Sequence, residues 1–233
     1  MMYFEFEEAD SIYRQTTVIV FDLNGLIIDD EPLQLEATNV ALRSHNVHLD
    51  GNTWIKKCVG KKPLEYLPEI IGDLFPYLEA QKVIAHKDAI YRSLLACADR
   101  LVRPGFFSLL ANAKANNKAV ALATSTSKDG VDAILALPEL NAPQFDFVIC
   151  GDDVDRAKPD PMIYNKVRLH FGPAAHFLVF EDSESGVKSA AAAHMKCFAV
   201  PNFFTAKQDL SQADLIISDL GATARVLRAN LPR

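Results

Sequence analysis

A short apolar run near the N-terminus constrains the fold of this chain more than any other feature. Residues 18–21 read VIVF, and Asp22 and Gly25 follow closely. A run of β-branched and aromatic residues without polar alternation is typical of a strand buried on both faces of a parallel sheet. Because ligands of such sheets bind beyond the carboxyl ends of the strands, Asp22 is a candidate catalytic group. Taken alone, this segment is more commonly a capping carboxylate before an Asn–Gly turn.

Downstream, short apolar runs alternate with segments of helical spacing. The further strands that we predict are at residues 119–123, 145–150, 177–180, 197–200 and 214–217. The helices predicted between and after them are at residues 106–117, 129–137, 161–171, 185–194 and 220–227. Alternating strands and helices imply crossover connections and a parallel sheet with helices on both faces. The sequence therefore predicts an α/β fold with a doubly wound, Rossmann-like parallel sheet.

A stretch without strand-like runs separates the first predicted strand from the others. Helices are predicted there at residues 32–46, 63–71 and 76–98. We expect an inserted helical cap domain of residues 33–100 and a core domain of residues 1–32 and 101–233. Residues 1–15 are expected to form a loosely attached leader. The acidic residues 29–31 are expected to be a solvated helix start, where they complement the helix dipole.

Composition excludes several classes of partner. The chain has 233 residues, of which 49% are hydrophobic, enough to bury a large core. Its net charge is −6 and no basic cluster is present, which argues against a nucleic-acid partner. No apolar run approaches the roughly 18 residues that cross a bilayer, and no secretory signal pattern is found at the N-terminus. The four cysteines are far apart. We expect a cytoplasmic protein with reduced, mostly buried thiols and no membrane partner.

Polar residues follow four of the predicted strands, at the edge where parallel strands end together. They are Asp22, Thr124, the pair 152–153 and the pair Glu181 and Asp182, and a proline-framed loop adds Lys158. Each alone is more commonly a turn or surface residue. Because clustered carboxylates repel one another unless a cation lies among them, the set predicts a divalent metal that prefers oxygen ligands, such as Mg²⁺. A metal, a lysine and a hydroxyl around a nucleophilic carboxylate are typical of a phosphoryl-transfer site.

Four segments give a more specific signal because they occur in a characteristic order and spacing. They read FDLNG at 21–25, LATST at 122–126, KPDP at 158–161 and FEDS at 180–183. In this arrangement the chain resembles the haloacid dehalogenase-like hydrolases, over nearly its whole length from about residue 17. It looks like the branch with a helical cap after the first motif, which includes sugar-phosphate phosphatases and β-phosphoglucomutase. The resemblance implies a small phosphorylated metabolite as substrate.

The resemblance also implies a role for each motif residue. Asp22 would attack phosphorus and form an aspartyl-phosphate, which divides hydrolysis into two easier steps. Thr124 would hydrogen-bond a phosphoryl oxygen, and Lys158 would hold the phosphate and the charge of the nucleophile. The implied Mg²⁺ ligands are Asp22, the backbone carbonyl of Asn24, Asp182, and Glu181 directly or through water.

Further positions are implied to contact the substrate or to shape the site. The segment of the cap that resembles the specificity loop of the family consists of Gly60, Lys61 and Lys62. A solvated basic turn is the alternative interpretation of this segment. Ser125 is a further candidate substrate contact, while Ser183 and Gly186 would shape the turn into the next helix.

Asn24 departs from the family pattern. The phosphatases and mutases of the family carry an aspartate two positions after the nucleophile, where it protonates the leaving oxygen and then activates water. An amide does neither near neutral pH, and loss of a general acid–base group typically costs about 10²–10⁴-fold in rate. Metal binding through the backbone carbonyl is unaffected. The sequence thus allows binding without efficient turnover.

The origin of Asn24 is left open by the sequence. Asn24 is an engineered substitution that traps bound substrate or a phospho-enzyme, or it is the natural residue of a binding protein or of an enzyme with altered chemistry. A third alternative is partial conversion to aspartate, since Asn–Gly pairs deamidate. An unshifted mass of the Asn24 peptide in aged protein would exclude the last. Our expectation is a Mg²⁺-dependent phosphatase impaired by Asn24. The alternatives are a phosphoglucomutase-like enzyme and a catalytically silent phosphate-binding protein. A phosphonate hydrolase that uses Lys61 or Lys62 is the least favoured.

Overall fold

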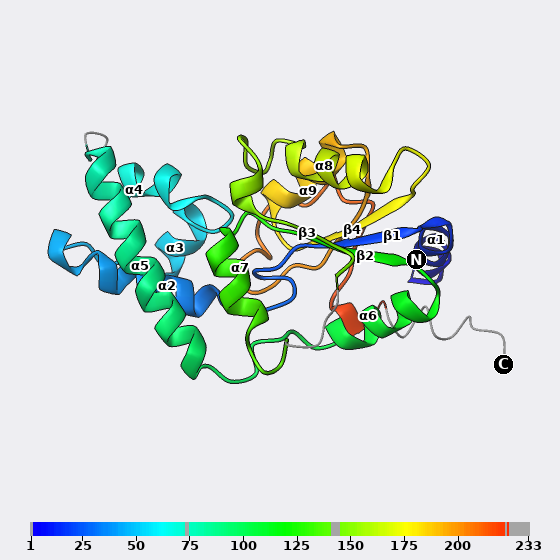
Figure 1. The fold of residues 1–233 in the computed structure, drawn as a ribbon, viewed down its shortest axis with the longest axis horizontal. Coiled ribbons are helices and arrows are strands. Elements are labelled where there is room, and N and C mark those ends of the chain that lie inside the picture. The colour runs from blue at the N-terminus through cyan, green and yellow to red at the C-terminus, as the bar shows by residue number, and fades with distance from the viewer. Residues whose placement is uncertain (1, 73–74, 141–144, 222, 224–233) are drawn as a thin grey trace.

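The computed structural model describes residues 2–72, 75–140, 145–221 and 223. Its centre is a six-stranded sheet in the order β3-β2-β1-β4-β5-β6, and every neighbouring pair is parallel (Figure 1). The strands are β1 (Val18–Phe21), β2 (Ala119–Ala123), β3 (Phe147–Ile149), β4 (Phe177–Glu181), β5 (Lys196–Ala199) and β6 (Leu215–Ile216). The predicted strands are thus found, with bounds that differ by a few residues.

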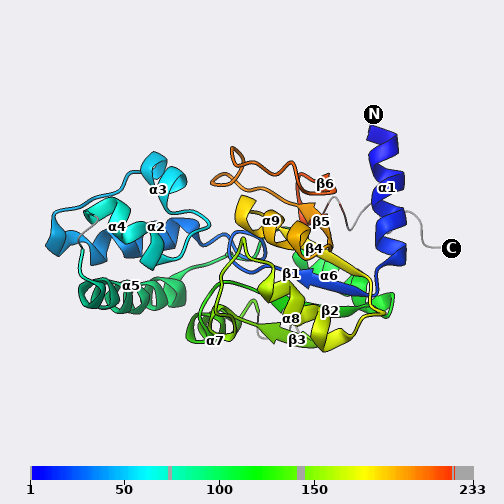
Figure 2. The same cartoon turned by 90° about the horizontal axis from the view of Figure 1, so that it is seen from above.

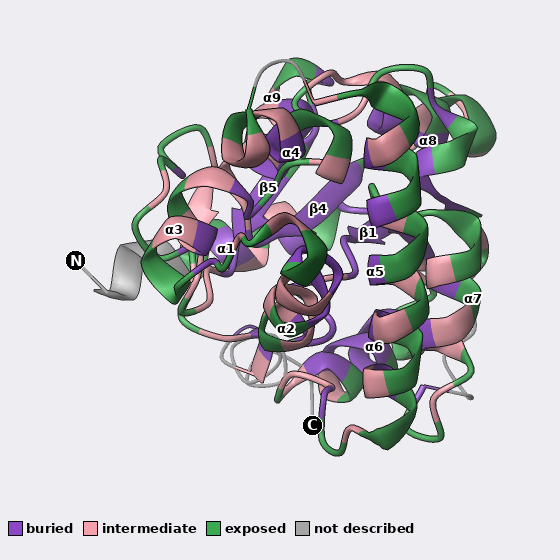
Figure 3. Cartoon of the chain, turned by 90° about the vertical axis from the view of Figure 1, so that its left-hand side faces the viewer, coloured by how far each residue is buried: buried purple, intermediate pink, exposed green. Residues whose placement is uncertain are grey.

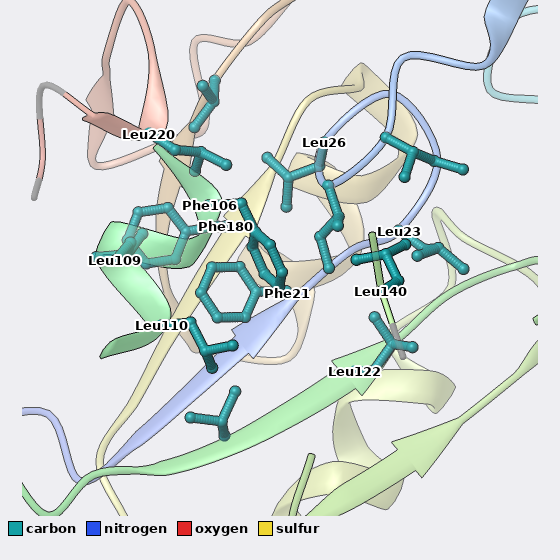
Figure 4. Close-up of a cluster of buried hydrophobic side chains, with 14 of the residues drawn as sticks. Phe21, Leu23, Leu26, Phe106, Leu109, Leu110, Leu122, Leu140, Phe180 and Leu220 are labelled. Carbon is teal, nitrogen blue, oxygen red and sulfur yellow. The ribbon is translucent and has the colours of Figure 1, made fainter. Parts of the chain in front are cut away.

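The strand β1 lies inside the sheet, between β2 and β4, as its uninterrupted apolar run predicts. Its side chains alternate between the two faces: Ile19 and Phe21 join one buried cluster, and Val18 and Val20 join the other. The ring of Phe21 is 5.4 Å from those of Phe106 and Phe180, and Figure 4 shows this aromatic centre. Burial of four apolar side chains on both faces fixes the register of β1 and hence the position of Asp22.

Helices cover both faces of the sheet (Figure 2). They are α6 (Phe106–Ala115), α7 (Lys128–Leu135), α8 (Met162–Phe171) and α9 (Glu184–Ala192), and a 3₁₀ turn (Gly151–Asp153) follows β3. Buried side chains of α6 and α7 belong to the Phe21 cluster, while those of α8 and α9 belong to the Val20 cluster. The doubly wound α/β fold is therefore confirmed.

A second group of helices follows β1 and lies at one end of the molecule (Figures 1 and 2). It consists of α2 (Glu31–Ala41), a 3₁₀ turn (Arg43–His45), α3 (Gly51–Lys57), α4 (Pro63–Ile71) and α5 (Tyr77–Cys97). The group has its own buried cluster, centred on Trp54, Tyr66 and Leu67. The predicted helical insertion is present, and its helices begin at Glu31 and end at Cys97.

The expected loose leader is wrong. Residues Met2–Gln15 form helix α1, at the end of the molecule opposite the inserted helices (Figure 2). Tyr13 is 4% exposed and donates a hydrogen bond to Asn112 Oδ1 at 2.5 Å, and Ala9 is also buried. The Lys118 ammonium lies 4.4 Å from the centre of the Tyr13 ring. The face of α1 that contains Ala9 and Tyr13 packs on the core. The many acidic residues of the segment hide this face in the sequence.

Other expectations are only partly met. Asp29 is exposed, but Asp30 is fully buried, so a solvated start of α2 is wrong for Asp30 (Figure 3 shows burial around α2). Most of the predicted helix 220–227 lies outside the described residues. Cys97 is exposed, and the remaining three cysteines are buried and unpaired. Within the described residues, no helix is both long and apolar enough to cross a membrane.

Candidate active site

The polar residues that follow β1, β2 and β4 meet at one edge of the sheet. Phe21 is in register with Leu122 and Phe180, so the strands end side by side. Asp22, Thr124 and Asp182 therefore surround one point, and all three line a cavity of about 420 Å³. Residues of the inserted helices line the same cavity, which lies between the sheet edge and this group.

Lys158 organises the charges in this cavity. Its ammonium donates to Asp22 Oδ1 and to Glu181 Oε1, both at 2.6 Å, and to the carbonyl oxygen of Ala123 at 3.0 Å. Tyr164 lies beneath it, donates to the same Glu181 oxygen at 2.6 Å and places its ring 5.1 Å from the ammonium. Both Asp22 and Glu181 are buried, so this cation compensates two carboxylates at once.

The acidic groups outnumber the cation. Burial raises the pKa of Asp22 to about 7, against the lowering effect of Lys158. Burial, together with the charges of Asp22 and Glu181, raises the pKa of Asp182 well above its usual range. Burial would lower the pKa of Lys158, but the charges of Asp22 and Glu181 outweigh this and raise it. Three buried carboxylates that share one ammonium group carry uncompensated negative charge, which favours a bound cation.

The same three carboxylates fit a divalent metal. Oxygen atoms of Asp22, Glu181 and Asp182 lie within 4.8 Å of one another. This all-oxygen donor set suits Mg²⁺ in charge and hardness. Glu181 already accepts hydrogen bonds at both carboxylate oxygens. Its Oε1 accepts from Lys158 and Tyr164, and its Oε2 accepts from the backbone nitrogen of Asp182 at 3.2 Å. Asp22 and Asp182 are consequently the more available ligands.

Two glycines are required by close packing at this point. A Cβ on Gly25 would lie 2.3 Å from Asp182 Oδ2, and φ is +77° there, a region that favours glycine. A Cβ on Gly186 would lie 1.9–2.1 Å from the carboxylate atoms of Glu181. Ser183 caps α9 by accepting a hydrogen bond from the Gly186 backbone at 3.2 Å, so the turn has the shape expected from the sequence.

The side chain of Asn24 is hydrogen-bonded on both sides. Its Oδ1 accepts from the Thr126 hydroxyl at 2.5 Å, and its Nδ2 donates to Asp30 Oδ2 at 2.7 Å. Asn24 lines the cavity together with Asp22. The backbone nitrogen of Gly25, which would attack Asn24 in deamidation, donates to the carbonyl of Ile28 at 2.7 Å. These contacts hold Asn24 and Gly25 and oppose deamidation.

Asp30 is the residue that sequence reasoning missed. Its Oδ2 also accepts from the Tyr91 hydroxyl at 2.6 Å and from Gln34 Nε2 at 3.1 Å. Burial raises its pKa, and these hydrogen bonds lower it in part. Its other oxygen, Oδ1, is buried and has no hydrogen-bond partner within the described ranges. An acid at a helix start gave no signal for this, because its shortest hydrogen bond comes from Tyr91, 61 positions away.

The remaining predicted site residues are distributed around the cavity. Its lining includes Ser125, Gly60, Lys61 and Lys62. The Gly60 carbonyl accepts from Ser185 on α9 at 3.3 Å, so this segment contacts the core. Lys61 is paired at 3.0 Å with Glu69, at the outside of α4. Asp152 also lines the cavity, but the pair 152–153 does not belong to the metal-type cluster found among the described residues.

Further lining residues come from the inserted helices. Trp54 donates to Glu31 Oε2 at 2.7 Å, and burial raises the pKa of Glu31 to about 7. Lys87 is 9% exposed and lies 3.5 Å from Asp88. It could have been found from the sequence, since it interrupts an apolar face of α5 at four-residue steps, between Val83 and Tyr91.

The structure thus defines a doubly wound α/β protein in which a parallel sheet ends in a buried lysine–carboxylate cluster beneath inserted helices. Comparison with known families makes this specific. The family model described as haloacid dehalogenase-like hydrolase matches residues 16–194. The match covers most of the chain, and the chain belongs to the haloacid dehalogenase-like hydrolases.

Relatives of this family cover nearly the whole chain. Protein CbbY of Rhodobacter capsulatus is 29% identical, over 92% of this chain and 98% of its own length. The phosphorylated carbohydrates phosphatase of Thermotoga maritima is 32% identical, over 75% of this chain and 80% of its own. CbbY of Rhodobacter sphaeroides, solved as an aspartate-to-asparagine mutant with xylulose-(1,5)bisphosphate, has a TM-score of 0.77 at 26% identity, over 88% of this chain and 95% of its own. The predicted family and the class of phosphoric monoester hydrolase are confirmed.

Proposed function

We propose that this chain is a Mg²⁺-dependent phosphatase of a small phosphorylated metabolite, of the sugar-phosphate type, with turnover slowed by Asn24. One observation carries the proposal: Lys158 holds Asp22 at 2.6 Å at the floor of the cavity, with Glu181 and Asp182 beside it. A carboxylate held by a buried cation can act as a nucleophile without a neighbouring base.

The residues then divide the work as follows. Asp22 forms a bond to phosphorus while the P–O bond to the ester alcohol breaks; the alcohol leaves as an alkoxide that takes a proton from water, and an aspartyl-phosphate results. Water then attacks the phosphorus of this intermediate, which releases phosphate and restores Asp22. Lys158 holds the attacking carboxylate in place and balances its charge, and the Thr124 hydroxyl hydrogen-bonds a phosphoryl oxygen. Mg²⁺ would be held by Asp22, Asp182, the Asn24 carbonyl and, more remotely, Glu181; when bound, it neutralises the charge of the phosphoryl oxygens.

The inserted helices act as a cap in this proposal, with residues 33–100 as the domain. Their residues line the cavity that also contains Asp22, and the lining includes Lys61 and Lys62, just before α4, and Lys87 on α5. Closure of such a cap excludes water from the site. Ser125, next to Thr124 on the core side, is the corresponding substrate contact from the sheet.

The relatives support a sugar phosphate as the substrate class. One is named as a phosphatase of phosphorylated carbohydrates, and another was solved with a sugar bisphosphate. The cavity is lined by apolar surface together with lysines, hydroxyl residues and carboxylates, which suits a phosphorylated and hydroxylated ligand. A requirement for a bisphosphate activator would favour a mutase instead.

Asn24 favours a second candidate, a silent phosphate-binding protein. Its amide is engaged by Thr126 and Asp30 and replaces the acid that protonates the leaving group. Ligand binding through Lys158, Thr124 and the metal would persist, since none of these contacts needs a proton from position 24. The two candidates differ in whether Asp22 is ever phosphorylated.

Phosphorylation of Asp22 tests the proposal directly. An aryl phosphate has a good leaving group, so its first step needs little help from an acid. We expect Mg²⁺-dependent formation of a phosphoryl adduct on the Asp22 peptide, seen by mass spectrometry. The adduct should persist, because loss of the base slows its hydrolysis by about 10²–10⁴-fold.

The matched control is Asp22→Asn, which keeps the shape of the site but should form no adduct. Chelation of Mg²⁺ should have the same effect in the parent protein. Metal-dependent binding of phosphate without any adduct would reject the enzyme and leave the silent binding protein.

A further inference from the structure

Asp30 joins three segments of the chain through one oxygen atom. Its Oδ2 accepts hydrogen bonds from Asn24 in the loop after β1, from Gln34 in α2, and from Tyr91 in α5. All three donors are neutral, and Asp30 forms no ion pair with any residue that the structure describes. Since Asp30 is fully buried, its contacts are fixed by the protein and not by water.

The contacts of Asn24 complement those of Asp30. The Asn24 side chain needs a donor on one side, which Thr126 supplies, and an acceptor on the other, which Asp30 supplies. A carboxylate at position 24 has no hydrogen to offer Asp30. It would instead place an oxygen acceptor about 2.7 Å from the buried Asp30 oxygen, the distance now bridged by the Asn24 amide. Such a contact replaces a hydrogen bond by repulsion between like charges.

We propose that Asn24 and Asp30 are a matched donor–acceptor pair, in which Asp30 is a positioning residue that fixes the amide of Asn24 at the catalytic cavity. Position 24 can carry a well-placed carboxylate only if position 30 offers a donor in place of the carboxylate. The catalytic consequence rests on the proposed function. The pairing itself does not, because it follows from the contacts alone.

The pair predicts that Asn24→Asp alone is a poor repair of the site. Repulsion from Asp30 would rotate the new carboxylate away, out of the position in which it would serve as acid and base. The exchanged pair, Asn24→Asp with Asp30→Asn, restores the contact between the two positions. Because all three donors of the parent meet the same oxygen, the amide nitrogen that replaces it at position 30 donates one hydrogen to the carboxylate at position 24 and the other to the Tyr91 hydroxyl, which can also accept, while the Gln34 contact is lost.

The experiment compares the parent, Asn24→Asp, Asp30→Asn and the exchanged pair in two measurements. Thermal unfolding without metal should show that Asn24→Asp is less stable than the parent and that the exchanged pair is more stable than Asn24→Asp. With Mg²⁺ and an aryl phosphate, the exchanged pair should have a kcat about tenfold or more above that of Asn24→Asp, because a repositioned base speeds the hydrolysis of the adduct that limits turnover.

Two further variants guard against an insoluble single variant and against a general effect. Asp30→Ser also offers a donor, so it should improve Asn24→Asp in the same direction as Asp30→Asn. Tyr91→Phe changes the same hydrogen-bonded group but leaves an acceptor facing position 24, so it should not improve Asn24→Asp.

The pairing would be overturned by two results together. The loss in melting temperature of the exchanged pair would equal the sum of the losses of the two single variants, and its kcat would be no higher than that of Asn24→Asp. The proposed function has a separate failure. If stability is recovered by the exchange but no variant hydrolyses the ester or forms a phosphoryl adduct, the pair is retained and the phosphatase is rejected.

Discussion

Two groups of buried carboxylates lie at the two ends of the loop that follows β1, and they are compensated in different ways. At one end, Asp22 and Glu181 share the Lys158 ammonium, and Asp182 adds further negative charge. At the other end, Asp30 is held by neutral donors only. Burial raises the pKa of Asp22, Asp182 and Asp30. The ion-paired group has excess negative charge, which favours a bound cation, whereas the other group holds side chains in place.

The largest effect should come from Lys158→Met, which removes the cation from the first group. Two buried carboxylates then lose their partner, and breaking a buried ion pair in this way costs about 3–5 kcal/mol of unfolding free energy. Formation of the phosphoryl adduct on Asp22 should be lost as well. Chemical denaturation of the metal-free protein measures the first effect, and mass spectrometry the second.

A matched control is Lys188→Ala, which breaks the exposed ion pair with Glu184 on α9. Exposed pairs of this kind contribute about 0.3–0.5 kcal/mol. If the two variants lose similar amounts of stability, the buried cation has no special role, and the contrast between the two carboxylate groups fails.

A smaller effect distinguishes the two groups directly, because each contains a tyrosine that donates to a carboxylate. Tyr91→Phe removes a donor from Asp30, and Tyr164→Phe removes one from Glu181. A hydrogen bond to a charged group contributes about 1.5–3 kcal/mol. We expect Tyr91→Phe to be near the upper value, since Asp30 has no cation, and Tyr164→Phe near the lower, since Lys158 still compensates Glu181.

Unfolding of both variants at one pH measures this difference. Tyr13→Phe is a neutral control, because Tyr13 donates to the amide oxygen of Asn112 and not to a carboxylate. A larger loss for Tyr164→Phe than for Tyr91→Phe would mean that the cation does not set the difference between the groups.

The sequence predicted the ion-paired group well and the other group poorly, for a physical reason. An apolar strand has only one buried register, so the residue after it, Asp22, is placed at the sheet edge by the strand itself. The same holds for Thr124 and for Glu181 and Asp182. The order of the motifs therefore contains most of the geometry of this end of the site.

The contacts of Asp30 depend on packing between elements far apart in the chain. Tyr91 is 61 positions away, on a helix whose rotation and tilt no local pattern determines. Trp54 comes from the same inserted helices and was likewise missed, whereas Lys87 could have been found from its place on the apolar face of α5. The boundaries of strands were predicted to within a few residues, but the partners of a helix face need tertiary structure.

The smallest predicted effect concerns Glu31, next to Asp30, and depends on pH. Its pKa is raised from 4.5 to about 7 in the folded chain, mainly by burial, with the charge of Asp30 adding to it. Between these values the folded state binds more protons than the unfolded state, so stability falls as the pH rises through this range. Glu31→Gln removes the group that titrates and keeps an oxygen that accepts from Trp54.

Glu31→Gln should therefore be increasingly more stable than the parent between about pH 4.5 and pH 7, with no further gain above that range. Because Glu31 is partly exposed at the cavity wall, we expect a difference of about 1 kcal/mol at the upper end, below the full value of the shift. Denaturant titrations at several pH values measure it. Glu184→Gln is the control of opposite sign, since Lys188 and backbone hydrogen bonding lower the pKa of Glu184. A difference between Glu31→Gln and the parent that does not change with pH would show that Glu31 is as well solvated as an ordinary surface carboxylate. Asp30 would then be the carboxylate at this end of the loop whose pKa burial raises.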